Sequence, residues 1–227
     1  MTNETKPLSV AVEEQIIRII KENELRPGDR LDTEMELSRR LGVGRGTVRE
    51  AIKGLVSRNI LVVRQGSGTF ISPRPGVSDD PLGLTFAKQD RQLALDLLDV
   101  RLMLEPEMAA MAADRATDYE LKRLEAQCAK VERFIRGERV YQQEDVELHR
   151  CIALASHNQV VGTLVPVIHS SASLNIDLTR NELKENTIRS HRELVNAIRG
   201  RDPQRARYAM ILHLAENRRY LQGTQQE

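Results

Sequence analysis

The sequence predicts a mostly α-helical protein with two domains: an N-terminal winged helix-turn-helix with a two-stranded β-wing, and a C-terminal all-α helical bundle. Residues 33–71 have the pattern of two short helices across a tight turn, followed by two apolar runs around a glycine-rich tip. Beyond residue 81 the apolar residues follow a helical period, with no strand alternation. Aromatic residues are only 3% of the chain and tryptophan is absent, which favours a helical core of aliphatic side chains.

The helices of the first domain follow from capping signals and apolar spacing. We expect a first helix over residues 9–23. Thr33 and Glu36 have the spacing of a capping box at the start of a second helix, and Gly42 suits the left-handed residue that ends it. A third helix opens at residue 44 or 45, and its apolar side chains keep a 3.6-residue spacing as far as Val56.

Two short apolar runs follow the third helix and predict the wing. Residues 60–63 and 69–71 flank the segment 64–68, which contains Gly66 and Gly68. Glycines at a hairpin tip allow the backbone to turn tightly and to approach a groove or a phosphate closely.

Positive charge is concentrated in this part of the chain. Residues 39–75 carry eight lysines and arginines against one acid, Glu50, a net charge of +7 in a chain whose total is +1. Phosphate binding requires such a concentration. The polar face of the third helix carries Arg45, Thr47 and Arg49, and arginine at such a position can form two hydrogen bonds with guanine. The alternative is the solvated basic face of an ordinary helix.

A set of residues between positions 8 and 72 carries a family resemblance. They are Leu31, Glu34, Glu36, Leu37, Leu41, Gly42, Val43, Arg45, Val48, Arg49, Glu50, Ala51, Leu55, Gly66, Gly68, Thr69 and Phe70. This pattern resembles the winged helix of the GntR family of bacterial transcription regulators. The resemblance implies a homodimer that binds a pseudo-palindromic double-stranded DNA operator. The implied DNA-binding residues are Arg45, Thr47, Arg49, Gly66, Ser67 and Gly68.

The chain departs from this family pattern at three places. Asp32-Thr33 stands where the family usually has Pro-Ser, and Met35 stands where the family often has an arginine that contacts DNA. Gly44 and Gly46 replace the more usual small polar residues. These departures bear on which operator sequence is preferred, and DNA binding remains the expectation.

A linker separates the two predicted domains. Three prolines, a glycine and a reversal of charge lie between residues 72 and 81. We therefore expect a DNA-binding domain over residues 1–75, a linker over 76–81, and an all-helical domain for effector binding and dimerisation over 82–227.

The second domain is predicted to contain six or seven helices. A stripe of six apolar residues, interrupted by Pro106, predicts the first long helix: Leu93, Leu97, Val100, Leu104, Met108 and Met111. The spacing of Thr117 and Glu120 predicts a capping box for a helix that ends at Gly137. The remaining helices are expected over residues 143–156, 159–178, 183–198 and 203–221, with a further short one around 81–87.

The sequence also indicates in which cellular compartment the protein is expected. The two cysteines, Cys128 and Cys151, do not make a disulfide framework and fit a reduced cytoplasm, where both would pack as small buried side chains. No apolar run approaches the roughly 18–20 residues that a membrane span needs. The N-terminal residues lack the pattern of a signal peptide. We expect a cytoplasmic protein that does not bind membranes.

Three of the five histidines fall on different predicted helices in similar amphipathic settings. His149 follows Asp145 by four residues, so that the imidazole and the carboxylate share one helix face. His191 and His213 lie on the two last predicted helices, the latter between apolar neighbours. One carboxylate and three imidazoles that point inward can hold Zn²⁺, Ni²⁺, Mn²⁺ or Fe²⁺. The alternative is that each histidine is a satisfied core residue.

A second set of residues carries a further resemblance. They are Val100, Arg101, Leu104, Glu105, 109–113, Asp145, His149, 155–158, His191, Leu194, Ala197, Ile198, Asp202, Ala206, His213 and Leu214. Residues 93–219 thereby resemble the FCD domain, the all-helical ligand-binding partner of the winged helix in the FadR-type branch of the GntR family.

The FCD resemblance implies a divalent metal ion, Zn²⁺ before Ni²⁺, Mn²⁺ or Fe²⁺, at the floor of a cavity. The residues that would hold the ion are Asp145, His149, His191 and His213. Arg101 would bind the carboxylate of an effector, although it can instead be a surface or ion-pair arginine. Asn217, one turn beyond His213, is a further candidate for the effector site, whereas His157 and His169 fall outside the set of metal ligands.

These features together predict a metabolite-responsive transcription regulator, with repression relieved by ligand as the commoner mode in the family. The effector would be a small carboxylate, such as a hydroxy acid or a sugar acid. We expect no catalytic residues, because no general base or nucleophile motif accompanies the metal ligands. The alternatives are a metal-dependent enzyme fused to a DNA-binding domain, a regulator whose metal is purely structural, and a regulator with an acyl-CoA or lipid effector.

Overall fold

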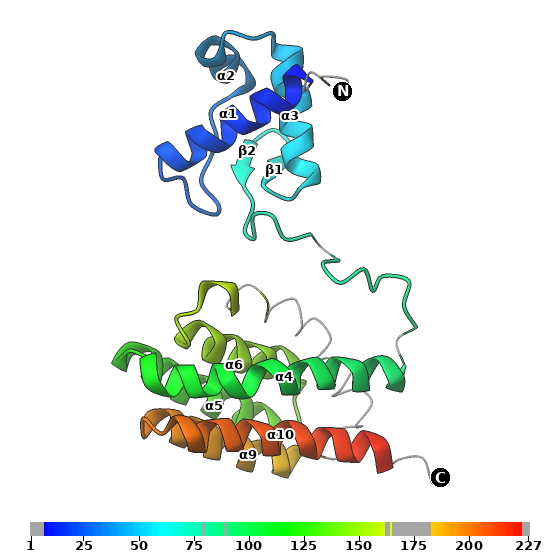
Figure 1. Cartoon of the computed structure of the whole chain (residues 1–227), viewed down its shortest axis with the longest axis vertical. Coiled ribbons are helices and arrows are strands. Elements are labelled where there is room, and N and C mark those ends of the chain that lie inside the picture. Colours follow the sequence, from blue (N-terminus) through cyan, green and yellow to red (C-terminus); the bar gives the residue numbers. More distant parts are fainter. Residues whose placement is uncertain (1–6, 79, 89, 162–163, 165–182, 224–227) are drawn as a thin grey trace, which may run out of the picture. The chain divides into compact units, whose positions relative to one another are not determined.

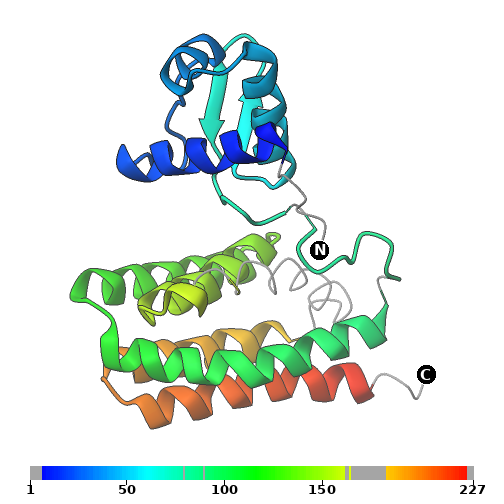
Figure 2. The ribbon, with the colours of Figure 1, turned by 45° about the horizontal axis from the view of Figure 1, so that its top comes forward.

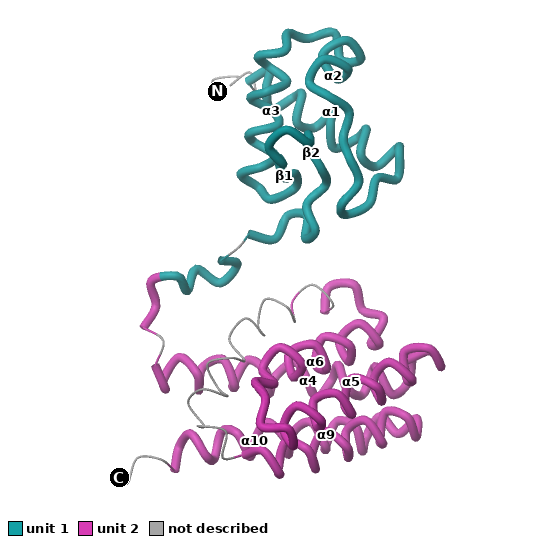
Figure 3. Tube along the Cα trace, turned by 180° about the vertical axis from the view of Figure 1, so that it is seen from behind, with its two compact units in different colours: residues 1–85 teal, residues 86–227 magenta. Residues whose placement is uncertain are grey.

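The computed structural model describes residues 7–78, 80–88, 90–161, 164 and 183–223. The chain divides into two compact units, residues 1–85 and residues 86–227 (Figure 3). The fold is mostly helical, with a two-stranded antiparallel sheet in the first unit, as the sequence predicts.

The first unit has three helices and a wing (Figure 1). The helices are α1 (Leu8–Glu22), α2 (Glu34–Leu41) and α3 (Arg45–Ser57), and the strands are β1 (Leu61–Arg64) and β2 (Gly68–Ile71). The strands pair in antiparallel register, with Leu61 opposite Ile71. Apolar side chains from all five elements form one core, in which Ile16, Leu37 and Leu55 are fully buried.

The predicted capping box fixes the start of α2. The Thr33 hydroxyl accepts a hydrogen bond from the backbone N–H of Glu36, and the Glu36 carboxylate accepts one from the backbone N–H of Thr33 at 2.8 Å. Gly42 ends the helix with a φ of 66°, in the left-handed region that glycine adopts at little cost. These local signals set the tight turn between α2 and α3.

The segment that precedes α2 is hydrogen-bonded to strand β2 of the wing. The backbone N–H of Leu31 donates to the carbonyl of Thr69 at 2.9 Å, so residues around Arg30 lie along β2. Gly68 has a φ of 116°, and a Cβ atom there would lie 3.0 Å from Nε of Arg30. The backbone conformation favours glycine at position 68, and a larger residue would also displace the Arg30 side chain slightly.

Asn59 forms hydrogen bonds with the segment that follows the wing. Its side-chain amide donates to the carbonyl of Val77, and its Oδ1 accepts from the Ser72 hydroxyl at 3.0 Å. The backbone N–H of Gly76 donates to the Asn59 carbonyl at 3.1 Å. The residues from 72 to 77 are therefore hydrogen-bonded to the first unit.

Residues 81–87 form turns, so the expectation of a short helix there is wrong. The Asp80 carboxylate accepts hydrogen bonds from the backbone N–H groups of Leu84 and Thr85, both at 2.8 Å. This aspartate side chain offers the backbone a local partner that competes with helical hydrogen bonding.

The second unit is a bundle of long helices (Figure 2). They are α4 (Arg91–Arg115), α5 (Asp118–Arg136), α6 (Gln142–Ala155), α9 (Lys184–Arg199) and α10 (Pro203–Gly223). Helix α4 packs against α10, α6 and α9, and α5 packs against α6 and α9. Of the helix expected over residues 159–178, all but 159–161 and 164 lie outside the described residues.

The buried face of α4 differs from the predicted apolar stripe. Val100 is 40% exposed, whereas Ala94 and Leu98 are fully buried. Two charged residues, Arg101 and Glu105, also lie on the buried face, each 2% exposed. The middle of the buried face of α4 is partly polar. A stripe drawn through apolar residues alone therefore follows the edge of this face.

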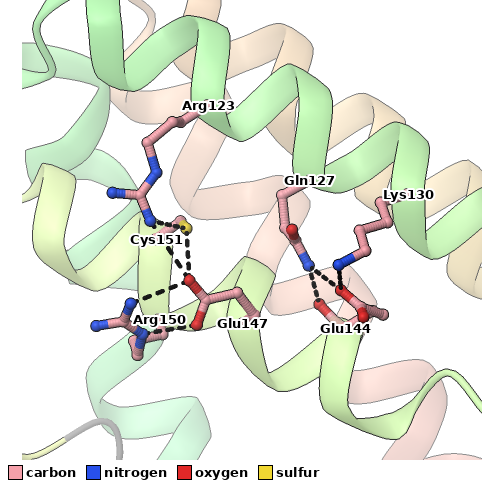
Figure 4. A network of polar contacts seen from close by, with 7 residues as sticks. All are labelled: Arg123, Gln127, Lys130, Glu144, Glu147, Arg150 and Cys151. Carbon is pink, nitrogen blue, oxygen red and sulfur yellow. Dashed lines mark hydrogen bonds and ion pairs between the residues drawn. The ribbon is translucent and has the colours of Figure 1, made fainter.

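A network of charged and polar side chains joins α5 to α6 (Figure 4). The Glu144 carboxylate accepts from Gln127 and Lys130, both at 2.9 Å. Nη2 of Arg123 on α5 lies 3.4 Å from Oε1 of Glu147 on α6, and Glu147 also pairs with Arg150 of its own helix at 2.7 Å. Exposed ion pairs of this kind contribute little stability individually.

The N-cap of α5 offers a test of local stability. We expect Thr117→Ala to lower the free energy of unfolding of the helical unit by about 1 kcal/mol, the usual cost of losing an N-cap hydroxyl. The Thr117 hydroxyl accepts from the backbone N–H of Glu120 at 3.3 Å, and alanine cannot replace this bond. Urea unfolding followed by circular dichroism measures the change, with Thr117→Ser as a control that keeps the hydroxyl. Equal stability of the alanine and serine variants would contradict the role of the cap.

Both cysteines are buried, as predicted, and their thiols should react slowly. Burial raises the pKa of Cys128 to about 11, with a contribution from Glu132, and burial also raises the pKa of Cys151. At pH 8 both thiols are therefore protonated and shielded, and the thiolate is the reactive form. We expect almost no reaction of the folded protein with Ellman's reagent within minutes, and two reactive thiols per chain in denaturant. Rapid release of colour from the folded protein would contradict this packing.

No helix among the described residues combines the length and apolar character that crossing a membrane requires.

Candidate metal centre and nucleic-acid interface

Three histidines from three helices meet inside the second unit. His149 lies on α6, His191 on α9 and His213 on α10, and none is more than 4% exposed. The distance between ring centroids is 5.5 Å for His149 and His191, 5.3 Å for His149 and His213, and 4.6 Å for His191 and His213. One nitrogen from each ring lies within 4.8 Å of the others, close enough to share one metal ion.

Asp145 lies beside this histidine cluster, one helical turn before His149. Its Oδ1 is 3.5 Å from Nε2 of His191, and its Oδ2 is 3.9 Å from Nε2 of His149. The carboxyl group is buried, with a residue exposure of 6%. The structure thus brings together all four residues that the sequence predicts as metal ligands.

The positions of the histidines follow from the apolar residues on the same helices. His149 has the fully buried Leu148 and Ile152 next to it and one turn on. Leu194, three residues after His191, and Met210, three residues before His213, are also buried. Since residues three or four positions apart share a helix face, burying these apolar residues turns each imidazole toward the bundle interior.

A serine hydroxyl bonds the outer nitrogen of His213. The Ser190 hydroxyl lies 3.2 Å from the carbonyl of Thr187 and 2.8 Å from Nδ1 of His213. Because a hydroxyl has one hydrogen, a Ser190 that donates to Thr187 accepts from Nδ1–H of His213. In that tautomer the neutral His213 ring carries its lone pair on Nε2.

Burial also keeps the rings of His191 and His213 neutral. Desolvation lowers the pKa of His191 to about 4, although the Asp145 carboxylate opposes this shift. Desolvation lowers the pKa of His213 well below its usual value, and the neighbouring His191 and His149 add to the effect. Neutral imidazoles at pH 7 have a free lone pair, the form in which histidine binds a metal.

The donor set fits a divalent transition metal. Neither ring nitrogen of His191 forms a hydrogen bond within the described part of the chain, although the ring is almost fully buried. A buried polar atom without a partner costs free energy and in native proteins usually has a water or ion beside it. Three imidazoles and the Asp145 carboxylate are ligands that Zn²⁺, Ni²⁺, Mn²⁺ and Fe²⁺ all accept.

Arg101 and Glu105 form a buried pair on α4 next to the histidines. Nε of Arg101 donates to Oε1 of Glu105 at 2.6 Å, and Oε2 of Glu105 lies 2.7 Å from Nδ1 of His149. Nη2 of Arg101 is buried and forms no hydrogen bond within the described residues. Arg101 is thus part of an ion pair and retains a donor for an anion. Asn217 lies partly buried on α10.

Two residues in this centre were not recognised from the sequence as contacts of the histidines. Glu105 enters the sequence argument only as part of a family pattern, and Ser190 is not singled out there. The signal that was available for Glu105 is its spacing of four residues from Arg101 in an otherwise apolar stretch. His157, which the sequence places outside the metal site, lies in an exposed position and bonds Glu120 at 2.9 Å. His169 lies outside the described residues.

The DNA-binding candidates of the first unit lie on the exposed face of α3. Arg45 is exposed in its first turn, and Thr47 is partly exposed. Arg49 pairs with Glu34 of α2, with 2.7 Å between Nη2 and Oε2, while its side chain remains 54% exposed. The hydrogen bonds from Arg49 lower the pKa of Glu34, which is therefore ionised at pH 7. This partner of Arg49 was not predicted.

The wing presents the second group of candidates. Gly66 has a φ of 72°, and the backbone N–H of Ser67 donates to the carbonyl of Arg64 at 2.9 Å, which closes the turn. Gly66 and Ser67 are exposed and Gly68 is partly exposed. Arg30, which approaches Gly68, adds a basic side chain beside the wing that sequence reasoning did not single out.

Comparison with known proteins agrees with this division of the chain. Residues 8–71 match the model of bacterial regulatory proteins of the gntR family, and residues 96–216 match the FCD domain. The putative L-lactate dehydrogenase operon regulatory protein of Escherichia coli (strain K12) is 31% identical over 92% of this chain and 84% of its own length.

Two further proteins are similar over nearly the whole chain. The Glc operon transcriptional activator of Escherichia coli (strain K12) is 32% identical, over 94% of this chain and 89% of its own. The solved structure described as Streptococcus agalactiae GntR superposes with a TM-score of 0.84 at 39% identity, covering 93% of this chain and 99% of that one. The matching families are of transcription regulators, and not of enzymes. This chain belongs to the gntR family of bacterial regulatory proteins and carries an FCD domain after its winged helix.

Proposed function

We propose that this DNA-binding transcription regulator binds a pseudo-palindromic operator as a homodimer and responds to a small carboxylate. In this proposal its helical unit holds a divalent metal ion, Zn²⁺ foremost, through Asp145, His149, His191 and His213. The observation that carries the proposal is the buried group of three imidazoles beside Arg101, whose Nη2 atom has no hydrogen-bond partner among the described residues.

The DNA-binding half of the proposal rests on the exposed basic face of α3. Arg45 and Arg49 would contact base edges or phosphates, and Thr47 would contact a phosphate or a base. The tip formed by Gly66, Ser67 and Gly68 would reach a groove or the backbone. In a homodimer two recognition helices meet half-sites about 34 Å apart, which accounts for a pseudo-palindromic operator.

The effector half rests on chemical complementarity. A carboxylate can ligate a metal through one oxygen and accept hydrogen bonds from a guanidinium through the other. A small hydroxy acid or sugar acid offers such oxygens, and Asn217 is a further candidate contact. The name of one relative refers to an L-lactate dehydrogenase operon, which makes L-lactate a reasonable first acid to test.

The regulatory mode is proposed to be repression that the acid relieves. The acid would bias the two winged helices of the dimer toward a spacing that does not fit the operator. A coupling free energy of about 1–3 kcal/mol between the two sites is enough to change occupancy severalfold or more. One relative is named as an activator. A reporter gene would therefore determine whether this regulator represses or activates transcription.

A thermal-shift screen with and without metal removal tests the proposal. Small hydroxy acids and sugar acids are added to untreated protein and to protein stripped with EDTA and dialysed. A ligand that binds only the folded protein raises the melting temperature, so one acid should stabilise the untreated protein and not the stripped one. The acid found in this way should then weaken binding to an operator selected from random DNA.

Two outcomes would contradict different halves of the proposal. If the protein contains no metal before EDTA treatment and added zinc does not raise its melting temperature, the metal site is wrong. If every acid leaves operator affinity unchanged while metal removal lowers stability, the metal is purely structural.

A further inference from the structure

We propose that Glu105 is a positioning residue shared by the metal site and the effector site, so that Arg101 influences metal affinity through Glu105 and His149. This inference rests on the proposed function of the helical unit. Glu105 bonds Arg101 through Oε1 at 2.6 Å and His149 through Oε2 at 2.7 Å. The three side chains form a continuous buried chain, each 2% exposed.

The first role of Glu105 is to orient His149. A carboxylate paired with a guanidinium can only accept hydrogen bonds, so His149 must donate its Nδ1–H to Oε2. The lone pair of a neutral His149 ring is then on Nε2, the nitrogen that faces Asp145. Metal-binding histidines generally need such an outer partner, whose loss typically weakens metal binding about 10-fold to 100-fold.

The second role of Glu105 is to hold Arg101. The pair spans one turn of α4, and the bond to Nε leaves Nη2 of Arg101 without a hydrogen bond among the described residues. An effector carboxylate that approaches the guanidinium would therefore bind a group whose orientation Glu105 has fixed. Arg101 and the metal ligand His149 thus share one carboxylate.

The shared carboxylate makes the two sites dependent on each other. The guanidinium draws negative charge toward Oε1, which weakens Oε2 as an acceptor for His149. An anion on Nη2 offsets this pull, so that Glu105 accepts more strongly from Nδ1–H and Nε2 becomes a better metal ligand. Hydrogen-bond chains polarise their members in this way in a low dielectric. By thermodynamic reciprocity, a bound metal would then strengthen anion binding at Arg101.

The competing explanation is that Glu105 only links α4 to α6. A purely structural link would affect stability without determining which nitrogen of His149 carries the proton. It would also make the effect of changing Arg101 on metal affinity independent of Glu105. Both consequences can be measured.

The first measurement compares Glu105→Gln with Glu107→Gln. Glu107 lies two residues away on α4, and its ion pair with Arg207 is on the surface, so the control makes the same chemical change outside the centre. Zinc affinity is measured by competition with a chromophoric chelator. We expect Glu105→Gln to weaken zinc binding about 10-fold to 100-fold and Glu107→Gln to leave it unchanged. Equal affinities of the two variants would overturn the proposal.

The second measurement reads the His149 tautomer in metal-free protein. Long-range ¹H–¹⁵N spectra distinguish Nδ1–H from Nε2–H imidazole, with a His149→Gln variant to assign the ring. The wild type and Glu107→Gln should show Nδ1–H, and Glu105→Gln should show a mixture. An unchanged spectrum in Glu105→Gln would refute the positioning role. If the wild type binds no zinc, the proposed metal function fails, and this spectrum still decides whether Glu105 positions His149.

The third measurement is a double-mutant cycle on zinc affinity. Arg101→Met is made in the wild type and in Glu105→Gln. In Glu105→Gln the buried Arg101 charge loses its partner, and the double variant removes that charge. We expect Arg101→Met to tighten zinc binding several-fold more in the wild-type background than in the Glu105→Gln background. Equal effects in the two backgrounds would show that Arg101 does not act through Glu105. Circular dichroism confirms that each variant is folded.

Discussion

Replacing Arg45 and Arg49 together by alanine is expected to abolish specific operator binding while the protein stays folded. Both side chains are exposed on α3, and neither belongs to the core of the first unit. A good arginine contact with a base pair discriminates between sequences by about 10-fold to 100-fold, so losing two removes most of the preference for the operator. Exposed substitutions of this kind have little effect on stability.

Fluorescence anisotropy checks this expectation on two DNA fragments, one selected from a random pool by the wild-type protein and one scrambled. Arg133→Ala with Arg199→Ala makes the same change in net charge on the helical unit and should retain the preference. The ratio of the two affinities is the quantity to compare, because removing positive charge also weakens non-specific binding. If the double variant on α3 keeps the wild-type ratio, α3 is not the recognition helix.

Replacing His191 by alanine is expected to weaken zinc binding at least about 100-fold. Structural zinc sites contribute roughly 10–16 kcal/mol through four ligands, or about 3 kcal/mol for each ligand. His191 lies nearest the other donors, 3.5 Å from Asp145 and with its ring centroid 4.6 Å from that of His213. Its removal leaves three donors, and the loss of about 3 kcal/mol corresponds to roughly a 100-fold weaker affinity.

Zinc affinity and melting temperature together test the His191 substitution. The wild type should melt at a higher temperature with zinc than without, and His191→Ala should show almost no difference. His157→Ala is the matched control, because this exposed imidazole bonds Glu120 away from the cluster and should leave zinc binding unchanged. A zinc affinity of His191→Ala within a few-fold of the wild type would exclude His191 as a ligand.

The parts of the fold that the sequence predicted are those that local signals specify. The capping boxes at Thr33 and Thr117 are present as expected, because each depends on residues only three positions apart. The left-handed turn at Gly42 and the hairpin between β1 and β2 are likewise short-range features. The convergence of the histidines was also predictable, since each lies in register with apolar residues on its own helix.

The parts that the sequence did not predict depend on contacts between distant segments. Glu105 meets His149 across 44 positions of the chain, and Arg49 meets Glu34 across 15. A single-sequence pattern contains no information about such pairs. The predicted apolar stripe of α4 lies at the edge of the buried face for a related reason. A charged residue such as Arg101 is expected to be exposed unless its buried partner is known.

The distribution of the candidate metal ligands along the chain has a consequence for synthesis. The first two lie on α6, the third on α9, and the last, His213, lies on α10 near the end of the chain. Because a ribosome makes the N-terminus first, the winged helix is complete and free to fold long before His213 emerges. The nascent protein would thus gain its DNA-binding unit before the candidate metal ligands could come together, and metal capture through all four would require that α10 has been made.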